Sequence, residues 1–260
     1  MGEGQGDRNF DGLTRRFQRN IYGTLKGRIR LAVLERDLLE PLPALLGPGP
    51  LRVLDAGGGT GELAGRLAAR GHDVTLCDIS GEMLAMARRR CAELAPGRPV
   101  RFVQAPLQAL PAEVGGPFDL ILLHAVLEWL AEPRAALTGL LERLRGGGLL
   151  SLLFYNRHGL VMKQLLHGQL ARVRAGAPGG RGRGLTPSRP LDPDEVLGWL
   201  AEAGLERLAH SGVRCFTDYL PPDTRAALDE QELLDTELWL GRQDPYRAIA
   251  RYQHVLARRP

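Results

Sequence analysis

The segment VLDAGGGTGELA, which spans residues 53–64, constrains the fold more than any other part of the chain. An apolar stretch ending in Asp55 runs directly into a cluster of glycines, and a stretch with helical periodicity follows. Glycine suits a tight turn that a ligand must approach closely, because it has no Cβ. Free N–H groups at the start of the following helix suit an anionic group of that ligand. We therefore expect a strand over 51–55, a ligand-binding turn and a helix over 62–70.

The alternation of strand and helix continues along the chain. Apolar runs predict further strands at 74–78, 100–104, 118–124, 149–154, 205–216 and 249–257. Amphipathic runs predict helices at 81–94, 133–144, 160–173, 194–203 and 224–242, with a turn at 146–148. Strands that alternate with helices form parallel sheets covered on both faces. We therefore expect an α/β fold with a doubly wound, mostly parallel, seven-stranded Rossmann-like sheet.

Two segments flank or interrupt this alternation. Apolar residues at near-helical spacing predict an N-terminal helical cap over 1–50; they include Phe10, Leu13, Phe17 and Ile21. An insertion over 156–192 contains a run of Gly, Pro and Arg at 175–190 that has almost nothing to bury, so we expect a mobile loop there. The absence of repeats and of a clean linker favours one domain over 1–260.

Composition excludes several classes of protein. The chain is 44% hydrophobic and 25% charged, as is ordinary for a globular protein. Its three cysteines are odd in number and form no C-x-x-C pair, which argues against a disulfide framework and a zinc site. No apolar run is long enough for a signal peptide or a membrane span. We expect a cytoplasmic protein without metal, and a net charge of +4 is compatible with a polyanionic partner.

The glycine turn fits two kinds of ligand. Residues 59–64 match the dinucleotide pattern G-x-G-x-x-[GA], in which the turn binds a pyrophosphate. The alternative is S-adenosylmethionine, and Asp55 favours it, because a carboxylate there can contact an amino group but would repel a pyrophosphate. Asp78, at the end of the second strand, suits the ribose hydroxyls of either cofactor. A structural turn with no ligand is the third possibility.

Further pocket residues are expected where the other strands end. The carboxyl ends of parallel strands meet at one edge of the sheet, and ligands bind at the point where the strand order reverses. The second strand leads into Ile79, the third leads into residues 105–108, and the fourth ends in His124. His124 is equally compatible with a buried core histidine.

The motifs together resemble one family over essentially the whole chain. The most specific are FQRNIYGTLKGRIR at 17–30, GGLLSLLFYNRHGL at 147–160 and SGVRCFTDYL at 211–220, beside the more general LRVLDAGGGTGELA at 51–64. They resemble the bacterial tRNA 5-carboxymethoxyuridine methyltransferases, of the class I S-adenosylmethionine-dependent superfamily. The resemblance implies methyl transfer from S-adenosylmethionine to the carboxylate of 5-carboxymethoxyuridine at the wobble position, with a tRNA anticodon stem-loop as partner.

The resemblance also implies roles for particular residues. Arg214, within GVR, is the candidate for orienting the substrate carboxylate, and Tyr155 is a second candidate catalytic residue. A surface or interdomain ion pair is the alternative role for Arg214. The chain departs from the family at its loop, where we expect clustered lysines but find Arg181, Arg183 and Arg189 among Gly and Pro. The expected cofactor-binding residues are Arg30, Asp55, Gly57, Gly58, Gly59, Gly61, Asp78, Ile79, Leu107, Gln108 and His124.

A carboxylate acceptor explains why no catalytic base stands out. Carboxyl groups ionise near pH 4, so the nucleophile is already charged at neutral pH. Holding it in line with the methyl group and removing water are then the main sources of acceleration. Anticodon bases are read by stacking and by arginine, and the candidate stacking residues are Tyr22, Tyr155, Phe216 and Tyr219.

Three other functions keep part of this pattern. A methyltransferase for a small or carrier-bound carboxylate would use the same cofactor residues without RNA. A non-catalytic RNA-binding module would not need an intact Asp55, glycine turn and Asp78. A nicotinamide oxidoreductase would use the glycine turn for a dinucleotide.

Overall fold

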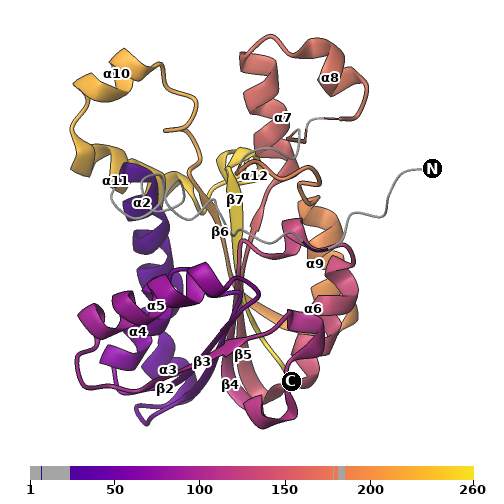
Figure 1. Ribbon diagram of the computed structural model, residues 1–260. Helices are drawn as coiled ribbons and strands as arrows, with labels where there is room; N and C mark the ends of the chain where they lie inside the picture. Colours follow the sequence, from indigo (N-terminus) through magenta and orange to yellow (C-terminus); the bar gives the residue numbers. More distant parts are fainter. Residues whose placement is uncertain (1–6, 8–23, 178, 181–184) are drawn as a thin grey trace.

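Residues 7, 24–177, 179–180 and 185–260 are the part of the chain that this computed structural model describes. A seven-stranded sheet runs through its centre in the order β3-β2-β1-β4-β5-β7-β6 (Figure 1). The strands are β1 (Arg52–Ala56), β2 (Asp73–Asp78), β3 (Val100–Gln104), β4 (Phe118–His124), β5 (Leu144–Tyr155), β6 (Glu206–Val213) and β7 (Tyr252–Arg258).

The strand directions confirm the doubly wound fold. Strands β1 to β5 are parallel to their neighbours, and β7 lies antiparallel between β5 and β6, so the sheet is mixed at one side. The chain winds from β1 outward to β3 and then crosses back to place β4 on the other side of β1. The carboxyl ends of β1 and β4 therefore border the switch point, where ligands bind in such folds.

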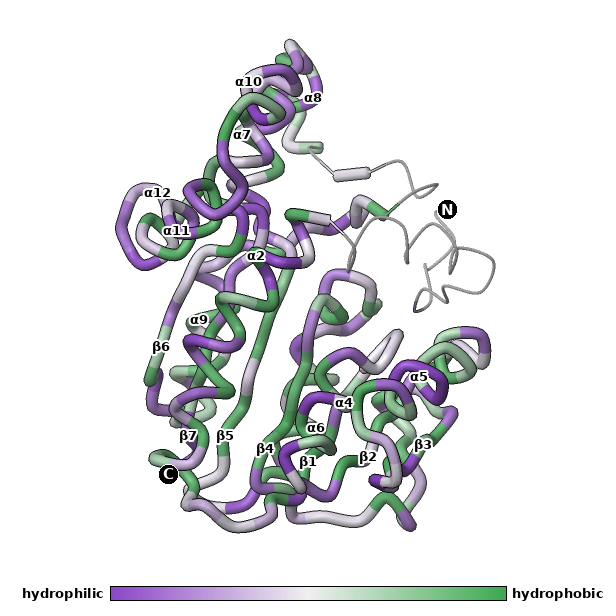
Figure 2. The backbone as a smooth tube through the Cα atoms, turned by 90° about the vertical axis from the view of Figure 1, so that its left-hand side faces the viewer, coloured by the Kyte–Doolittle hydropathy of each residue, from purple (hydrophilic) through white to green (hydrophobic). Residues whose placement is uncertain are grey.

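Helices cover both faces of the sheet. One face is covered by α3 (Leu42–Leu46), α4 (Glu62–Ala69), α5 (Gly81–Leu94) and the π-helix η1 (Glu35–Leu39). The other is covered by α6 (Pro133–Glu142) and α9 (Pro193–Glu202). The strands between these layers are largely hydrophobic, as Figure 2 shows for β4 and β5. Leucines at helical spacing in α4 and α6 explain why each presents one apolar face to the sheet.

A third group of helices stands at the carboxyl edge of the sheet. Figure 1 shows α7, α8 and α10 beyond the ends of the strands. Helix α2 continues into η1 and packs against α11 and β6. These helices are α2 (Leu25–Leu34), α7 (Arg157–Leu166), α8 (Leu170–Arg174), α10 (Pro222–Ala227), α11 (Glu230–Leu240) and α12 (Tyr246–Ile249). Short 3-10 helices are η2 (Leu107–Ala109), η3 (Ala112–Val114) and η4 (Leu127–Trp129).

Two predicted helices are each divided in the structure. The one expected over 160–173 is interrupted at Gly168, whose φ of +69° ends α7 before α8 begins. It also starts earlier than expected, because the Asn156 side chain accepts a hydrogen bond from His158 N at 2.9 Å. The helix expected over 224–242 is divided by Asp229, which caps α11 through the backbone N–H groups of Gln231 and Glu232.

Three strand boundaries also differ from the prediction. The turn expected at 146–148 lies inside β5, where Gly147 has a φ of +71° and the register against β4 shifts. The strand expected over 205–216 ends at Val213, since Arg214 has a φ of +65° that a strand does not accommodate. The last strand begins at Tyr252 rather than at residue 249.

The two flanking segments are described only in part. Residues 25–46 are largely helical, as expected of the N-terminal cap, whereas Phe10, Leu13, Phe17 and Ile21 lie outside the described residues. In the loop at 175–190 the described residues are turns and bends. Residues 178 and 181–184, which include Arg181 and Arg183, lie outside the described residues.

Candidate active site

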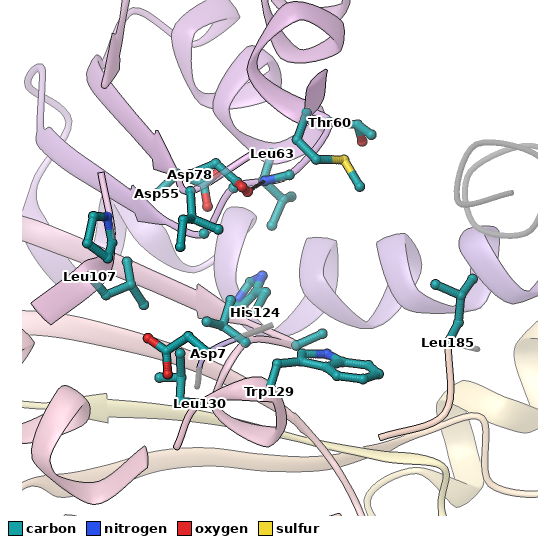
Figure 3. Close-up of a pocket in the computed structure, with 18 of the residues that line it drawn as sticks. Asp7, Asp55, Thr60, Leu63, Asp78, Leu107, His124, Trp129, Leu130 and Leu185 are labelled. Atoms are coloured by element: carbon teal, nitrogen blue, oxygen red, sulfur yellow. Dashed lines mark hydrogen bonds between the residues drawn. The ribbon is translucent and has the colours of Figure 1, made fainter. Parts of the chain in front are cut away.

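A pocket opens at the switch point between β1 and β4. Figure 3 shows Asp55 and Asp78 together at one side of it and Trp129 and Leu130 at another. The predicted cofactor residues that line it are Arg30, Asp55, Gly57, Gly58, Gly59, Asp78, Ile79, Leu107, Gln108 and His124. The structure therefore brings together residues that lie almost a hundred positions apart in the sequence.

The glycine turn is tied to the neighbouring strand. The backbone N–H groups of Gly57 and Gly58 donate to Cys77 O at 2.8 and 3.1 Å, respectively. Gly57 has a φ of +73°, and a Cβ there would lie 2.5 Å from Val126 Cγ2. Any other residue at this position would therefore displace the wall of the pocket.

Gly61 does not line the pocket, contrary to the prediction. Its φ is +77°, and a Cβ on it would lie 3.0 Å from the backbone of Ala87 in α5. The glycine lets α4 approach α5 closely, so its role in this structure is helix packing.

Two carboxyl groups stand side by side at the turn. Asp78 accepts hydrogen bonds from Gly59 N at 3.0 Å and from Ser80 N at 2.9 Å, which fixes its carboxylate at the pocket wall. Burial and, to a smaller extent, the nearby charge of Asp78 raise the pKa of Asp55 to about 7. Asp55 is only 4% exposed, so a cationic group in the pocket would favour its ionised form.

Buried polar atoms without partners point to a ligand. Within the described part of the chain, three buried side-chain atoms have no hydrogen-bond partner: Thr60 Oγ1, Glu128 Oε2 and Arg214 Nε. Thr60 lines the pocket, and burial raises the pKa of the neighbouring Glu128 to about 7. Orphaned buried polar atoms are costly, so Thr60 Oγ1 fits a pocket that a polar ligand completes.

His124 ends a chain of buried hydrogen bonds. Its Nε2 lies 2.8 Å from Ser151 Oγ, which lies 2.9 Å from His254 Nε2. His254 Nδ1 in turn lies 3.3 Å from Asp37 Oδ2. Burial lowers the pKa of His124 well below its ordinary value, so the ring is neutral. When His254 is also neutral, this order of bonds places the His124 proton on Nε2 and leaves Nδ1 free to accept.

Asp37 anchors this chain from the π-helix. Burial alone would raise the pKa of Asp37, but hydrogen bonds from His254 and Arg36 hold it well below its usual range. Arg242 also donates to Asp37, at 2.6 Å. His124 thus both lines the pocket and ends a hydrogen-bonded chain that runs into the core.

Arg214 and Tyr155 lie beside the pocket rather than in its lining. The Arg214 guanidinium lies 5.6 Å from the ring centre of Tyr252, and Tyr252 lines the pocket. The loop that carries Arg214 is held by the Glu237 carboxylate, which accepts hydrogen bonds from the backbone N–H groups of Cys215 and Thr217 at 2.6 and 2.9 Å.

Tyr155 is not placed to act on a ligand in the pocket. It is 5% exposed, and its hydroxyl accepts a hydrogen bond from Arg251 Nη1 at 3.2 Å. Its ring lies 4.9 Å from the ring of Tyr252, so it is not free to stack on a base. The Tyr219 hydroxyl donates to Ile249 O at 2.6 Å and lies 3.0 Å from Gly159 O. Tyr22 lies outside the described residues.

Several lining residues were missed from the sequence. Asp7 reaches the pocket from the N-terminal segment and accepts hydrogen bonds from Gln108 Nε2 at 2.8 Å and Ala131 N at 2.9 Å. Trp129, in η4, also lines the pocket. Tyr252 begins β7 and Leu185 lies in the loop at 175–190; no local pattern marks either as a lining residue.

Two kinds of feature are missing from the described residues. They contain no group of three or more His, Cys, Asp or Glu side chains that could hold a metal ion. None of the helices that the structure describes is long and apolar enough to cross a membrane.

Comparisons with known proteins agree with this geometry. A family profile described as a methyltransferase domain matches residues 53–148. The tRNA 5-carboxymethoxyuridine methyltransferase of Escherichia coli (strain K12) is 45% identical over 98% of this chain and 97% of its own length. The ubiquinone biosynthesis O-methyltransferase of Xanthomonas axonopodis pv. citri (strain 306) is 31% identical over 74% of this chain and 77% of its own.

A solved structure shares the fold. The magnesium protoporphyrin IX methyltransferase of Synechocystis PCC 6803 with bound SAH superposes with a TM-score of 0.64 at 19% identity, over 96% of each chain. The sheet order, the glycine turn with its two acidic partners and these matches define a class I S-adenosylmethionine-dependent methyltransferase. Within that class, the chain belongs to the family of the tRNA 5-carboxymethoxyuridine methyltransferases, which it matches over nearly its whole length.

Proposed function

We propose that this enzyme transfers a methyl group from S-adenosylmethionine to the carboxylate of 5-carboxymethoxyuridine at the wobble position of tRNA, forming the methyl ester. The observation that carries the proposal is the 45% identity to a curated enzyme of that name over 98% of the chain. The pocket at the switch point supports it, because its acidic and glycine residues suit this cofactor.

The cofactor residues divide into three groups by chemistry. Asp78 is placed for the ribose hydroxyls, and Asp55 is placed for the amino group at the methionine end. Ile79, Leu107 and Gln108 would flank the adenine, since they follow β2 and β3. Arg30 and His124 form the wall nearest β4 and β7.

The reaction requires little acid–base catalysis from the protein. When bound, S-adenosylmethionine supplies an electrophilic methyl group on a positively charged sulfur. The acceptor carboxylate is ionised at neutral pH, so the protein has to orient it and exclude water. The apolar lining residues Leu130, Trp129 and Val126 serve the second task.

Arg214 is our candidate for orienting the acceptor carboxylate. Its guanidinium is 15% exposed and lies over Tyr252 at the border of the pocket, although it does not line the pocket itself. The ion pair with Asp218 keeps it in place. Tyr155 has no catalytic role in this proposal, because its hydroxyl accepts a hydrogen bond from Arg251.

The anticodon stem-loop would dock on the helices at the carboxyl edge of the sheet. Helix α8 carries Arg172 and Arg174 in its last turn, and the nearby Leu166 and Leu170 are 56% and 57% exposed. Positive charge beside exposed apolar side chains suits a single-stranded RNA loop. We also propose that the whole chain acts as one domain and that the enzyme works in the cytoplasm, where tRNA is modified.

Mass spectrometry of nucleosides tests the proposal directly. Purified protein, S-adenosylmethionine with a labelled methyl group, and tRNA bearing 5-carboxymethoxyuridine are incubated, and the RNA is digested. We expect the labelled methyl ester of that nucleoside. The same tRNA with unmodified uridine at the wobble position is the matched control and should take up no label. Intact cofactor binding without label in the RNA would refute the substrate and favour a small or carrier-bound carboxylate.

A further inference from the structure

Four basic side chains converge on one carboxylate beside the cofactor pocket. Asp218 forms an ion pair with Arg214 and accepts a hydrogen bond from Arg251 Nε at 2.9 Å. Lys26 Nζ lies 3.9 Å from the other carboxylate oxygen, Asp218 Oδ1. Lys163 interacts electrostatically with Arg251 and Asp218. We call these five residues the lysine cluster.

The lysine cluster has an excess of positive charge. Asp218 is ionised, because Arg214 and Arg251 hold its pKa well below the ordinary range against the effect of burial. Among the described residues, no other acidic side chain forms an ion pair with any of the four cations. Arg214 Nε is buried without a hydrogen-bond partner. An incoming anion would therefore relieve mutual repulsion in a partly desolvated site.

The lysines themselves are unusual in this chain. Of its 34 basic residues only Lys26 and Lys163 are lysines, and they come from α2 and α7, more than a hundred residues apart. The structure places both in the same cluster. Arginine is a flat fork with a fixed charge, whereas lysine is a compact ammonium whose pKa shifts readily on burial. Use of lysine at these two positions alone indicates a specific need for compact cations there.

The cluster borders the place where the methyl acceptor must lie. Tyr252 lines the cofactor pocket, and its ring lies 4.7 Å from the Arg30 guanidinium and 5.6 Å from that of Arg214. Arg251 is the residue before Tyr252, and its Nη1 donates to the hydroxyl of Tyr155 at the end of β5. All of these residues lie at the carboxyl edge of the sheet, on the same side as the cofactor.

We propose that Lys26 and Lys163, with Arg214 and Arg251, form an anion-binding pocket for an oxyanion of the RNA methyl acceptor. The proposal rests on the proposed function and extends it. The oxyanion comes either from the acceptor carboxylate or from a phosphodiester next to the target nucleotide. Asp218 and Tyr155 act as positioning residues, because they hold the two guanidinium groups without facing the cofactor.

The acid–base properties of the lysines agree with this role. Burial lowers the pKa of Lys163, and Arg251 lowers it further. Burial also lowers the pKa of Lys26, against the opposing attraction of Asp218. A bound oxyanion would raise both pKa values, since it favours the charged form.

The small number of lysines makes a direct test simple. Protein with ¹³C at the lysine Cε atoms gives two side-chain signals, whose pH titrations report each pKa. We expect both signals to shift, and both pKa values to rise, when an anticodon stem-loop bearing 5-carboxymethoxyuridine binds. If the bound oxyanion is the acceptor carboxylate, the unmodified stem-loop should raise the lysine pKa values much less than the modified one. If it is a phosphodiester, the two stem-loops should raise them equally. Lysine signals that do not shift at a saturating concentration of the stem-loop would overturn the proposed anion-binding pocket.

Kinetics of substituted enzymes provide an independent measurement. We expect Lys26→Met and Lys163→Met each to raise KM for tRNA about tenfold or more while S-adenosylmethionine binding is unchanged. Lys163→Arg should restore only part of the loss if a compact cation is required. Arg89→Met, an exposed charge in α5, is the matched control for net charge and should behave as wild type.

The two proposals fail in different ways. Wild-type enzyme is assayed for the methyl ester in parallel with the lysine spectra. No ester with any tRNA would overturn the proposed function, and the lysine spectra would still report whether the stem-loop brings an oxyanion to the cluster. Ester formation with unmoved lysine signals and unchanged KM in both methionine variants would overturn the lysine cluster alone.

Discussion

At the scale of single residues, Asp55 shows how burial sets the chemistry of the cofactor pocket. Its pKa is raised to about 7 by burial and by Asp78, so the carboxyl is largely protonated below neutral pH in the ligand-free enzyme. In the proposed cofactor complex, the Asp55 carboxylate binds the cationic amino group of S-adenosylmethionine. Ionisation and cofactor binding are therefore coupled.

We predict that S-adenosylmethionine binds about tenfold more tightly at pH 8 than at pH 6. Only the ionised fraction of Asp55 is competent to bind the amino group, and that fraction rises about tenfold across this range around a pKa of about 7. Calorimetry in buffers of different ionisation enthalpy should show proton release on binding at pH 6. Asp55→Asn should bind weakly with little pH dependence, and Asp73→Asn, an exposed residue at the other end of β2, is the control.

The raised pKa of Asp55 also predicts how the stability of the fold depends on pH. A carboxyl with a raised pKa is protonated in the folded state but ionised in the unfolded state between about pH 4 and pH 7. The folded state therefore loses stability as pH rises through this window. In the absence of cofactor at pH 8, we expect Asp55→Asn to be more stable than wild type by about 1–3 kcal/mol. Thermal unfolding measures this, and a lower Tm for the variant would contradict it.

At the scale of elements, three strands and a π-helix cooperate to orient one side chain. His124 on β4, Ser151 on β5 and His254 on β7 are joined across the sheet, and Asp37 on η1 completes the chain. The register of the sheet brings these side chains together. His124 and His254 both lie opposite Leu153 of β5, and Ser151, two residues before Leu153, lies on the same face between them. The pocket residue His124 thus depends on elements that do not touch the ligand.

We predict that Ser151→Ala destabilises the fold and alters His124. Removal of the hydroxyl leaves two buried imidazole nitrogens without partners, at a cost of about 2–4 kcal/mol. For a chain of this size we expect a fall in Tm of about 5–15 °C. The ¹⁵N shifts of the His124 ring should also change. Thr217→Val removes a buried hydroxyl that donates to Glu237, outside this chain of hydrogen bonds, so it should leave the His124 spectrum as in wild type.

At the scale of the whole molecule, charge distinguishes an RNA substrate from a small one. The net charge is +4, and basic side chains lie on the helices at the carboxyl edge of the sheet. Binding to RNA through about four or five phosphates should weaken about 50- to 500-fold between 50 and 200 mM salt, by counterion release. Fluorescence anisotropy of a labelled anticodon stem-loop measures this. An affinity that is independent of salt would argue against an electrostatic RNA interface.

Local sequence patterns were sufficient for the sheet and for the cofactor turn. The strand, glycine cluster and helix around Asp55 are encoded within a dozen residues, so their positions relative to each other follow from local geometry. The alternation of strands and helices then placed Asp78 and His124 at the same edge of the sheet. Element boundaries were less well predicted, because single residues such as Gly168 and Asp229 end or start helices through local contacts.

The sequence by itself determined the fold class, the cofactor turn and the family to which the chain belongs, because each depends on residues that are close together or on motifs that can be compared directly. Only the tertiary structure decided which distant side chains meet. Tyr252 in the cofactor wall, the bonds that join His124 to Asp37, and the two lysines beside Asp218 all depend on how β7, α2 and α7 pack at the edge of the sheet. No periodicity along the chain records such contacts, since they form between elements that are separated by a hundred residues or more.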